Sequence, residues 1–330
     1  MMVAYGSGRL LCKGLMVYLL WGAAWALLMP ASAWPWGCEG HQAVAMIAEK
    51  HMNPHALEMA NQLLRSQPID PTLNRYCGPS PDPMADAATW ADDLRSSRPE
   101  TGPWHFIDIP RGAPHSAIAE SCPAPAGCVT GAIEHQLDLL RNNGTDAKVR
   151  ADALRFLIHF VGDLHQPLHC TTNNDMGGNC VPVAFFGMSP VLKNPQYETY
   201  APNLHAIWDS GIIQRMKGSE SVEQWASSLD QQFSAQISAW QRGSAKPEDW
   251  AWESHQVAES VVYGRLPVPI PIEKPALVTG CSSDNHISQR MLKLDEEIAQ
   301  PYQDAVAPVI DAQIAKAGIR LAMILNRLWP

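Results

Sequence analysis

The stretch LRFLIHFVGDLHQPLHC, residues 154–170, combines the apolar pattern of a buried helix with three histidines and one aspartate. Its apolar residues recur at intervals of three and four, which predicts a helix packed in the protein core. Pro167 ends that helix, because proline cannot supply the backbone N–H that a helix interior needs. Ionisable groups are costly to bury unless they are paired or bind a metal ion. The stretch therefore predicts a core helix that carries a functional site.

Helical periodicity also dominates the rest of the chain. The same spacing of apolar residues occurs at 41–52, 84–97, 131–143, 148–165, 202–217, 219–241, 247–263 and 288–328. Alternating strand patterns are scarce, and NCVPVAFFG (179–187) is the best candidate for a short hairpin. Proline-rich stretches at 66–83 and 265–276 separate helices, and 170–203 is predicted to be a long irregular loop. We expect an all-α fold of many helices, with long loops over one end and at most one short β-hairpin.

The first 33 residues predict an export signal. Arg9 and Lys13 precede the apolar run LMVYLLWGAAWALLM (15–29), and the small-residue sequence ASA ends at Ala33. A basic region, an apolar region and a small-residue cleavage site are typical of a secretory signal peptide. A membrane anchor would want about 20 apolar residues, and this run is shorter. We expect an exported protein, periplasmic or secreted, with one domain over 34–330 and no membrane association after processing.

Seven of the eight cysteines lie beyond the predicted signal, and an exported protein can pair them into disulfides. Cys122 with Cys128, and Cys170 with Cys180, would each close a short loop, and these are the pairs we expect. An odd number leaves at least one thiol free or available to another molecule. Because no Cys-x-x-Cys pattern occurs, a thiolate zinc site is not expected.

Two His-x-x-x-Asp pairs stand out among the polar residues. His159 and Asp163 lie four apart on the predicted core helix and therefore share one face. His205 and Asp209 repeat this spacing in NLHAIWD, and His169 follows the core helix on its turn. Further candidates are His41 in WGCEGH, Asp92 in TWADDLR and His105 in WHFID.

Imidazole and carboxylate groups together form a ligand set that suits zinc. Five histidines and three aspartates are enough for more than one ion, and sites of two or more metal ions are used to hydrolyse phosphoesters. A histidine on an apolar helix can also be an ordinary core or surface residue. On this chemistry alone the chain is an exported helical protein that binds metal, with hydrolysis as one open possibility.

The order of these motifs resembles that of the zinc-dependent single-strand nucleases and 3′-nucleotidases of mung bean and fungi, the S-one/P-one type. The matching motifs are WGCEGH, WADDLR, WHFID, ALRFLIHFVGDLHQPLH, GGN, NLHAIWD and QIAKAGIRLA, and they extend over nearly all of the chain beyond the predicted signal. Bacterial zinc phospholipase C shares the broader fold and ligand scheme. It has Glu where this chain has Asp209, and it lacks the HFID and WAD-x-x-R context.

The resemblance implies three zinc ions per chain. The first would be held by Asp92, His105, His159 and Asp163, and the second by His169, His205 and Asp209. Asp163 would bridge to a third ion, which His41 and the α-amine and carbonyl of an N-terminal Trp would also bind. Spacing to His41 makes Trp36 the matching residue, whereas the cleavage signal points to the bond before Trp34. Further trimming would give Trp36 a free amine, and we expect Trp36 to be the ligand.

The resemblance also implies a reaction and a substrate pocket. The reaction is hydrolysis of phosphodiester bonds in single-stranded DNA and RNA, and of 3′-phosphates, by a zinc-held hydroxide, leaving 5′-phosphate ends. Arg95 lies one helix turn after Asp92 and matches a phosphate-stabilising arginine, whose guanidinium suits phosphate oxygens. Asp92, Asp163 and Arg95 are thus the expected catalytic residues. Phe106 matches a residue that stacks on the nucleobase, and Asp108 one that hydrogen-bonds its edge. In GGN, Gly177, Gly178 and Asn179 are expected to let the backbone approach the nucleotide.

The remaining histidines are expected to lie outside the ligand set. His165 matches no ligand of the family, and we expect it to donate a hydrogen bond behind the ligands or to a loop carbonyl. The expected surface histidines are His51, His55, His115, His135, His255 and His286.

The net charge of −9 argues against an extended basic groove, which stable nucleic-acid binders usually have. Three zinc ions would outweigh the aspartates that hold them and make the site locally positive. We therefore expect binding at the reacting phosphate of a flexible single strand or mononucleotide, with no stable nucleic-acid complex and no obligate protein partner. The alternatives are a phospholipase C-like phosphodiesterase on the same site and a zinc-binding module without turnover.

Overall fold

The histidine-rich stretch forms helix α7, Ala147–Leu164, and every residue from Ala153 to Leu164 is buried. The side chain of Asp146 begins the helix by accepting hydrogen bonds from the backbone N–H groups of Lys148 and Val149. A helix that is apolar on all sides packs in the interior. The computed structural model describes residues 36–122, 127–196, 198–292 and 298–330. The predicted signal peptide and Trp34 lie outside these residues.

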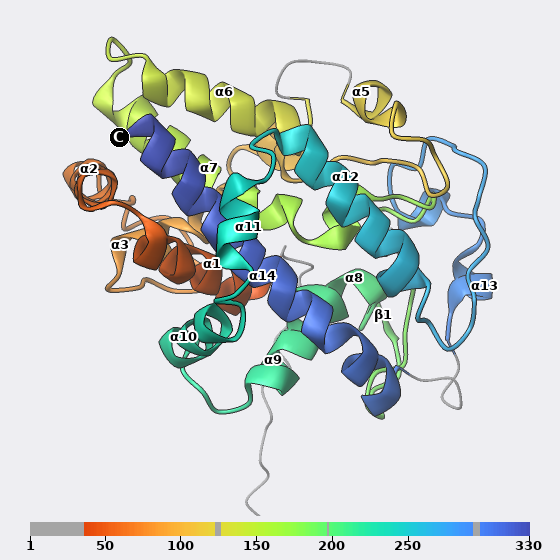
Figure 1. Cartoon of the computed structure of the whole chain (residues 1–330). Coiled ribbons are helices and arrows are strands. Elements are labelled where there is room, and N and C mark those ends of the chain that lie inside the picture. The colour runs from red at the N-terminus through yellow and green to blue at the C-terminus, as the bar shows by residue number, and fades with distance from the viewer. Residues whose placement is uncertain (1–35, 123–126, 197, 293–297) are drawn as a thin grey trace, which may run out of the picture. The chain divides into compact units, whose positions relative to one another are not determined.

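Two long helices pack with α7. Helix α1 spans Gly37–His51, and α14 spans Gln300–Leu328 and runs across α1 and α7 (Figure 1). Gly318 of α14 sits directly on Ile47 of α1, where an added Cβ would lie only 2.7 Å from the Ile47 Cβ. This contact requires glycine, because any larger residue would push the two helices apart.

Shorter helices surround this core. They are α2 (Pro54–Ser66), α3 (Pro83–Ala87), α4 (Trp90–Leu94), α5 (Ala117–Ser121), α6 (Val129–Arg141), α8 (Leu204–Ala206), α9 (Ile212–Lys217), α10 (Val222–Gln232), α11 (Ile237–Arg242), α12 (Pro247–Val257) and α13 (Ile287–Arg290). The 3₁₀ helices are η1 (Pro99–His105), η2 (Pro167–Cys170) and η5 (Cys281–Ser283), and π turns occur at η3 (Ile207–Gly211) and η4 (Ala258–Tyr263). The predicted all-α fold is confirmed.

Several predicted helices are interrupted. The stretch 84–97 divides into α3 and α4, 219–241 divides into α10 and α11, and 202–217 contains the π turn η3 between α8 and α9. Helix α2 was not predicted, although Asn53 accepts from the N–H of Ala56 and Pro54 opens the helix. Both are start signals of a helix.

The predicted hairpin at 179–187 is wrong. The two strands are instead β1 (Val191–Asn194) and β2 (Thr199–Ala201), paired antiparallel with Val191 opposite Ala201. Residues 180–185 are buried and form only isolated bridges, such as that between Pro182 and Asn203. Proline offers no N–H to a strand ladder, so this buried segment does not continue into a hairpin.

Three disulfides join Cys38 to Cys77, Cys122 to Cys128 and Cys180 to Cys281. The pair Cys122–Cys128 is confirmed, but the predicted Cys170–Cys180 pair is wrong. Cys170 is a free, buried thiol whose Sγ donates to the carbonyl of Leu164 inside the core. That orientation turns its side chain away from Cys180. Cys180 instead pairs with Cys281, which lies 101 residues further along the chain. Over the described part of the chain, no helix is long and apolar enough to cross a bilayer.

Candidate metal centre

Three clusters of metal-binding side chains meet at the C-terminal half of α7. Within each cluster, one ligand atom per residue lies within 4.8 Å of the others. The clusters are His41 with His159 and Asp163, Asp92 with His105 and His159, and His169 with His205 and Asp209. All eight side chains are buried. The structure therefore brings together every histidine and aspartate that the sequence suggested as a ligand.

Asp163 lies between several imidazoles. Its Oδ2 is 3.0 Å from Nδ1 of His105 and 3.2 Å from Nε2 of His159, and its Oδ1 is 3.3 Å from Nε2 of His41. His159 precedes it by one turn of α7, as the spacing predicted. One oxygen of this carboxylate therefore faces His41, and the other faces His105 and His159.

The partners of α7 come from three other segments. His41 is on α1, Asp92 on α4, and His105 ends the 3₁₀ helix η1. His41 stacks on His159 with ring centroids 3.9 Å apart. It can do so because Gly162 has no side chain: a Cβ there would lie 2.7 Å from Nδ1 of His41.

The third cluster lies on the loop side of α7. Nε2 of His205 is 3.2 Å from Nε2 of His169 and 3.2 Å from Oδ2 of Asp209. His169 is on η2, directly after Pro167 ends the core helix. Asp209 lies in the π turn η3, one turn after His205. Such wide turns inside helices often mark functional sites.

Backbone carbonyls fix the orientation of three imidazoles. Nδ1 of His159 donates to the carbonyl of Ala88 over 2.7 Å. Nδ1 of His169 donates to the carbonyl of His105 over 2.7 Å, and Nδ1 of His205 donates to the carbonyl of Gly177 over 2.6 Å. A ring that donates from Nδ1 keeps the lone pair of Nε2 free for a metal ion. The geometry is that of metal-binding histidines with supporting outer contacts.

Gln166 is a supporting residue that the sequence analysis missed. Its side-chain amide donates to Oδ1 of Asp209 over 2.5 Å, and its Oε1 accepts from the N–H of Leu168. The side chain is fully buried. The available sequence signal was the position of this amide in HQPLH, between the expected ligands Asp163 and His169.

The donor set fits a cation. Among the described residues, the buried side-chain atoms without a hydrogen-bond partner include Nδ1 and Nε2 of His41, Oδ1 of Asp92, Nε2 of His105, Oδ1 of Asp163 and Oδ2 of Asp209. Buried polar atoms are nearly always paired, so such a concentration in one place indicates that ions complete the site. Nitrogen and carboxylate oxygen together suit zinc.

The pKa values favour neutral imidazoles. Burial, together with nearby positive charge, lowers the pKa of His41 to about 4 and that of His205 to about 3. Burial also lowers the pKa of His105 to about 3. Neutral imidazole is the form that binds a metal. His159 differs: burial opposes its charge, but Asp163 and Asp92 outweigh it and raise the pKa to about 9. A metal that binds His159 therefore displaces a proton.

Trp36 lies in the same centre and is fully buried. Its indole Nε1 donates to the carbonyl of Gly162 over 2.8 Å, and its backbone carbonyl accepts from the N–H of Gly40. Its backbone N–H donates to the carboxylate of Asp209. The N atom thus contacts the third cluster, whereas the family resemblance places it with His41 and Asp163.

A cavity of about 540 Å³ opens beside the clusters. Its lining includes Arg95, Phe106, Asp108 and Asn179, which are four of the expected catalytic and substrate-binding residues. Nη1 of Arg95 is 3.5 Å from Oδ1 of Asp92, and the side chain is 36% exposed. Gly178 is not in the lining; it packs behind the cavity wall, where a Cβ would lie 3.3 Å from that of Leu204.

The cavity also has walls that the sequence did not indicate. They are formed by Met176, Thr199 and residues 278–281. Residues 278–281 lie about 100 positions after the GGN motif, and the Cys180–Cys281 disulfide brings the two segments together. No local pattern could have revealed this neighbour.

Two other histidines differ from expectation. Nδ1 of His165 donates to the carbonyl of Val161 on its own helix, rather than to a loop, and Arg320 donates to its Nε2. His255 was expected at the surface and is buried, so this prediction is wrong. Its Nδ1 lies 2.8 Å from Oγ1 of Thr171, because α12 packs directly on η2. His55, His115 and His135 are exposed, and His51 and His286 are partly buried.

The chain is similar to known proteins over nearly its whole length. The sequence profile of the S1/P1 nuclease family matches residues 36–330. Nuclease P1 of Penicillium citrinum is 29% identical over 314 residues, which cover 89% of this chain and 97% of that protein. Nuclease S1 of Aspergillus oryzae is 26% identical over 92% of this chain and 95% of its own length. Endonuclease 2 of Arabidopsis thaliana is 25% identical, with coverage of 96% and 98%.

Proposed function

The chain belongs to the S1/P1 nuclease family, and on that basis we propose that it hydrolyses phosphodiester bonds in single-stranded DNA and RNA, and the phosphate of 3′-nucleotides, leaving 5′-phosphate ends. Membership makes it a zinc-dependent phosphodiester hydrolase. The observation that carries the finer proposal is the placement of three ligand clusters around Asp163, beside a cavity that contains Arg95 and Phe106.

The proposed cofactor is three zinc ions per chain. The first is assigned to Asp92, His105, His159 and Asp163, the second to His169, His205 and Asp209, and the third to His41, Asp163 and Trp36. The ligand atoms left without hydrogen bonds in each cluster support this assignment. When bound, zinc lowers the pKa of a water molecule to about 7 and withdraws charge from phosphate oxygens.

Trp36 is proposed as the mature N-terminus of a single catalytic domain. The family match begins at this residue, and its backbone N atom already lies in the centre, beside Asp209. Cleavage before Trp36 converts that N–H into a free amine without moving the indole from Gly162. The proposal requires two residues to be trimmed beyond the bond that the signal sequence indicates.

The substrate is held by the residues of the cavity. Arg95 extends from α4 toward the clusters, where its guanidinium can donate two hydrogen bonds to phosphate oxygens. Phe106 offers a ring on which any base can stack, worth about 1–3 kcal/mol. Nδ2 of Asn179 donates to the carbonyl of Met176, so its Oδ1 remains to accept from the base, as does the carboxylate of Asp108. Asp92 and Asp163 position the ions that act on the phosphate.

The surroundings of the site fit an exported enzyme that releases its substrate. Three disulfides are typical of proteins that fold in an oxidising compartment. The chain is acidic, with a net charge of −9, so affinity for nucleic acid is confined to the positive metal centre. We propose no stable nucleic-acid complex, no obligate protein partner, and a periplasmic or secreted location.

The test is zinc content and turnover on one preparation of signal-processed protein, with its N-terminal residue read by mass spectrometry. We expect three zinc ions, Trp36 at the terminus, and cleavage of single-stranded DNA much faster than duplex. Preferential cleavage of lecithin would favour the phospholipase C-like alternative. Bound zinc without turnover on any phosphoester would favour a zinc-binding module, and protein that binds no zinc would overturn the proposal.

A further inference from the structure

One wall of the cavity consists of a segment that carries none of the metal ligands. Residues Val278–Cys281, here called the strap, all contribute to the lining. We propose that the Cys180–Cys281 disulfide holds the strap against the GGN loop, and that the strap so held is a specificity determinant that confines the nucleobase. This inference rests on the proposed nuclease function, because it concerns the same cavity.

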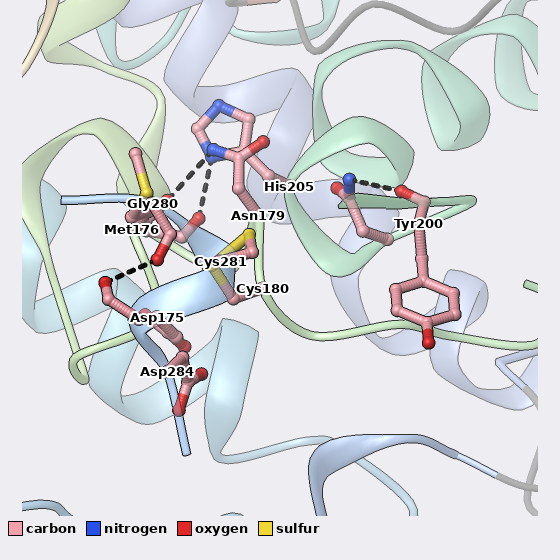
Figure 2. The surroundings of a disulfide bond; sticks show 12 residues. Asp175, Met176, Asn179, Cys180, Tyr200, His205, Gly280, Cys281 and Asp284 are labelled. Carbon is pink, nitrogen blue, oxygen red and sulfur yellow. Dashed lines mark hydrogen bonds between the residues drawn. A yellow bond between two sulfur atoms is a disulfide. The ribbon is translucent and has the colours of Figure 1, made fainter. Parts of the chain in front are cut away.

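The disulfide links the strap directly to a residue of the substrate pocket. Cys180 follows Asn179 in the chain, and Cys281 follows Gly280, so the bond places both neighbours at the cavity. Figure 2 shows Gly280 and Cys281 beside Met176 and Asn179, with His205 close by. Both cysteines are buried, and they pack with Ile287 and Tyr200 in a small apolar cluster separate from the main core.

The non-covalent anchors of the strap lie at its two ends. On the N-terminal side, Asn174 bonds to the backbone of Lys274 (2.7 Å) and Ala276 (2.9 Å). On the C-terminal side, Arg290 pairs with Asp284 and donates to the carbonyl of Asn173 over 3.0 Å.

Between these anchors the strap packs weakly. Leu277, the residue before the strap, is 90% exposed, and Thr279 is exposed as well. The hydroxyl of Ser283 accepts from the N–H of Thr279 and donates to the carbonyl of Gly280, which shapes the turn but does not fix it to the GGN loop. Few apolar contacts and exposed hydrogen bonds characterise segments that open easily. The disulfide is therefore the main restraint on the position of this wall.

The strap completes an enclosure for a single base. The lining also includes Arg95, the expected ligands His105 and His205, and the expected base-binding residues Phe106 and Asp108. A volume of about 540 Å³ lies in the range of small-molecule sites. A base enters such an enclosure only after it has left its stack and its pairing partner. Displacing the strap removes contacts to the base but leaves the metal ligands and Arg95 in place.

The experiment compares two substrates with the same backbone. One is an oligothymidylate, and the other is an oligomer of abasic residues of equal length. For Cys180→Ser/Cys281→Ser we expect the KM for oligothymidylate to rise about tenfold, with kcat and zinc content near those of the wild type. The KM for the abasic oligomer should not change. The matched control Leu277→Ser changes the exposed residue before the strap, which does not line the cavity, and should leave both KM values unchanged.

A second variant keeps the disulfide and fills the cavity. Thr279→Trp replaces an exposed side chain of the lining, so we expect it to fold, and it should also raise the KM for oligothymidylate. This variant decides the matter if the cysteine variant does not fold. Wild-type KM values in both variants would overturn the inference. If the wild type turned over neither oligomer, the proposed function would fail instead. Calorimetric binding of thymidine 5′-phosphate to the same variants would then still test whether the strap contributes to base binding.

Discussion

Oδ1 of Asp163 lies 3.3 Å from Nε2 of His41, while the other oxygen of the same carboxylate faces His105 and His159. Helix α1 and helix α7 therefore meet at one acidic group, and His159, one turn earlier on α7, belongs to two of the three clusters. The contacts of Asp163 come from α1 (His41), from η1 (His105) and from α7 itself (His159), so this carboxylate joins three elements at the centre.

Asp163→Asn should remove at least one zinc ion and lower kcat/KM by about a thousandfold or more. The amide keeps the size of the side chain but loses the charge that the first and third proposed ions share. Zinc per chain, measured together with activity, checks this. Asp138→Asn is the control, since Asp138 is 77% exposed on α6. An Asp163→Asn protein with full zinc and full activity would contradict the shared site.

Arg95→Ala should lower kcat by about 10²–10³, the usual effect of removing one donor that stabilises transition-state charge. Zinc content should not change, because the guanidinium is not a ligand. Arg98→Ala provides a matched control: Arg98 is on the same segment, is 42% exposed, and pairs with Glu100. Equal losses in both variants would show that Arg95 acts only on the local fold.

Gln166→Leu should weaken the cluster of His169, His205 and Asp209. The amide of Gln166 holds Oδ1 of Asp209, and loss of such outer contacts typically costs 10–100-fold in metal affinity. Competition with a zinc chelator should release one ion per chain earlier than from the wild type, with the other two unaffected. Unchanged release of all three ions would rule out this positioning role.

Removal of zinc should destabilise the fold. Eight buried ligands face one another in the centre, and an ion that binds only the folded chain at 1,000 times its Kd contributes about 4 kcal/mol. A loss of that size should lower the Tm by about 10 °C. Scanning calorimetry with and without chelator measures the shift, and re-addition of zinc should restore it. A Tm that did not change when chelator was added would show that the centre is stable without ions.

Glu49→Gln should stabilise the protein at alkaline pH. Burial and the neighbouring Asp82 raise the pKa of Glu49 from 4.5 to about 8. A group whose pKa is raised by folding stabilises the folded state at pH values below its pKa in the unfolded state. That stabilisation is lost as the pH rises through its pKa in the folded state. The variant should therefore match the wild type near pH 4.5 and exceed it by about 1–2 kcal/mol above pH 8. Denaturant midpoints measured across this pH range test the prediction, with the exposed residue variant Glu58→Gln as control. A difference between variant and wild type that did not change with pH would exclude Glu49 as the cause.

The parts of the fold that could be predicted are those whose signals are local. His159 and Asp163 share a helix face because four residues nearly complete a turn, and Pro167 ends that helix wherever it packs. The motifs around His41, Asp92 and His105 identified the partners of α7 through family resemblance, which spacing alone could not do. The structure brings these residues together, although their roles as ligands remain a prediction.

The parts that could not be predicted depend on which way a side chain faces. A short loop made Cys170 and Cys180 an attractive pair, but Cys170 faces Leu164 in the core. His255 has the sequence context of a surface residue and is buried because α12 packs on η2. The strap shows no periodicity, and its place beside Asn179 follows from a bond that closes 101 residues.

The Cys180–Cys281 bond has a consequence for the cell that makes this enzyme. RNA is abundant in the cytoplasm, where reducing conditions keep cysteines as thiols. A chain that remained there would lack the Cys180–Cys281 bond, which we propose holds one wall of the base pocket. On the proposed role of the strap, full affinity for nucleic acid therefore requires an oxidising compartment. The same requirement would protect the producing cell's own transcripts from the complete enzyme.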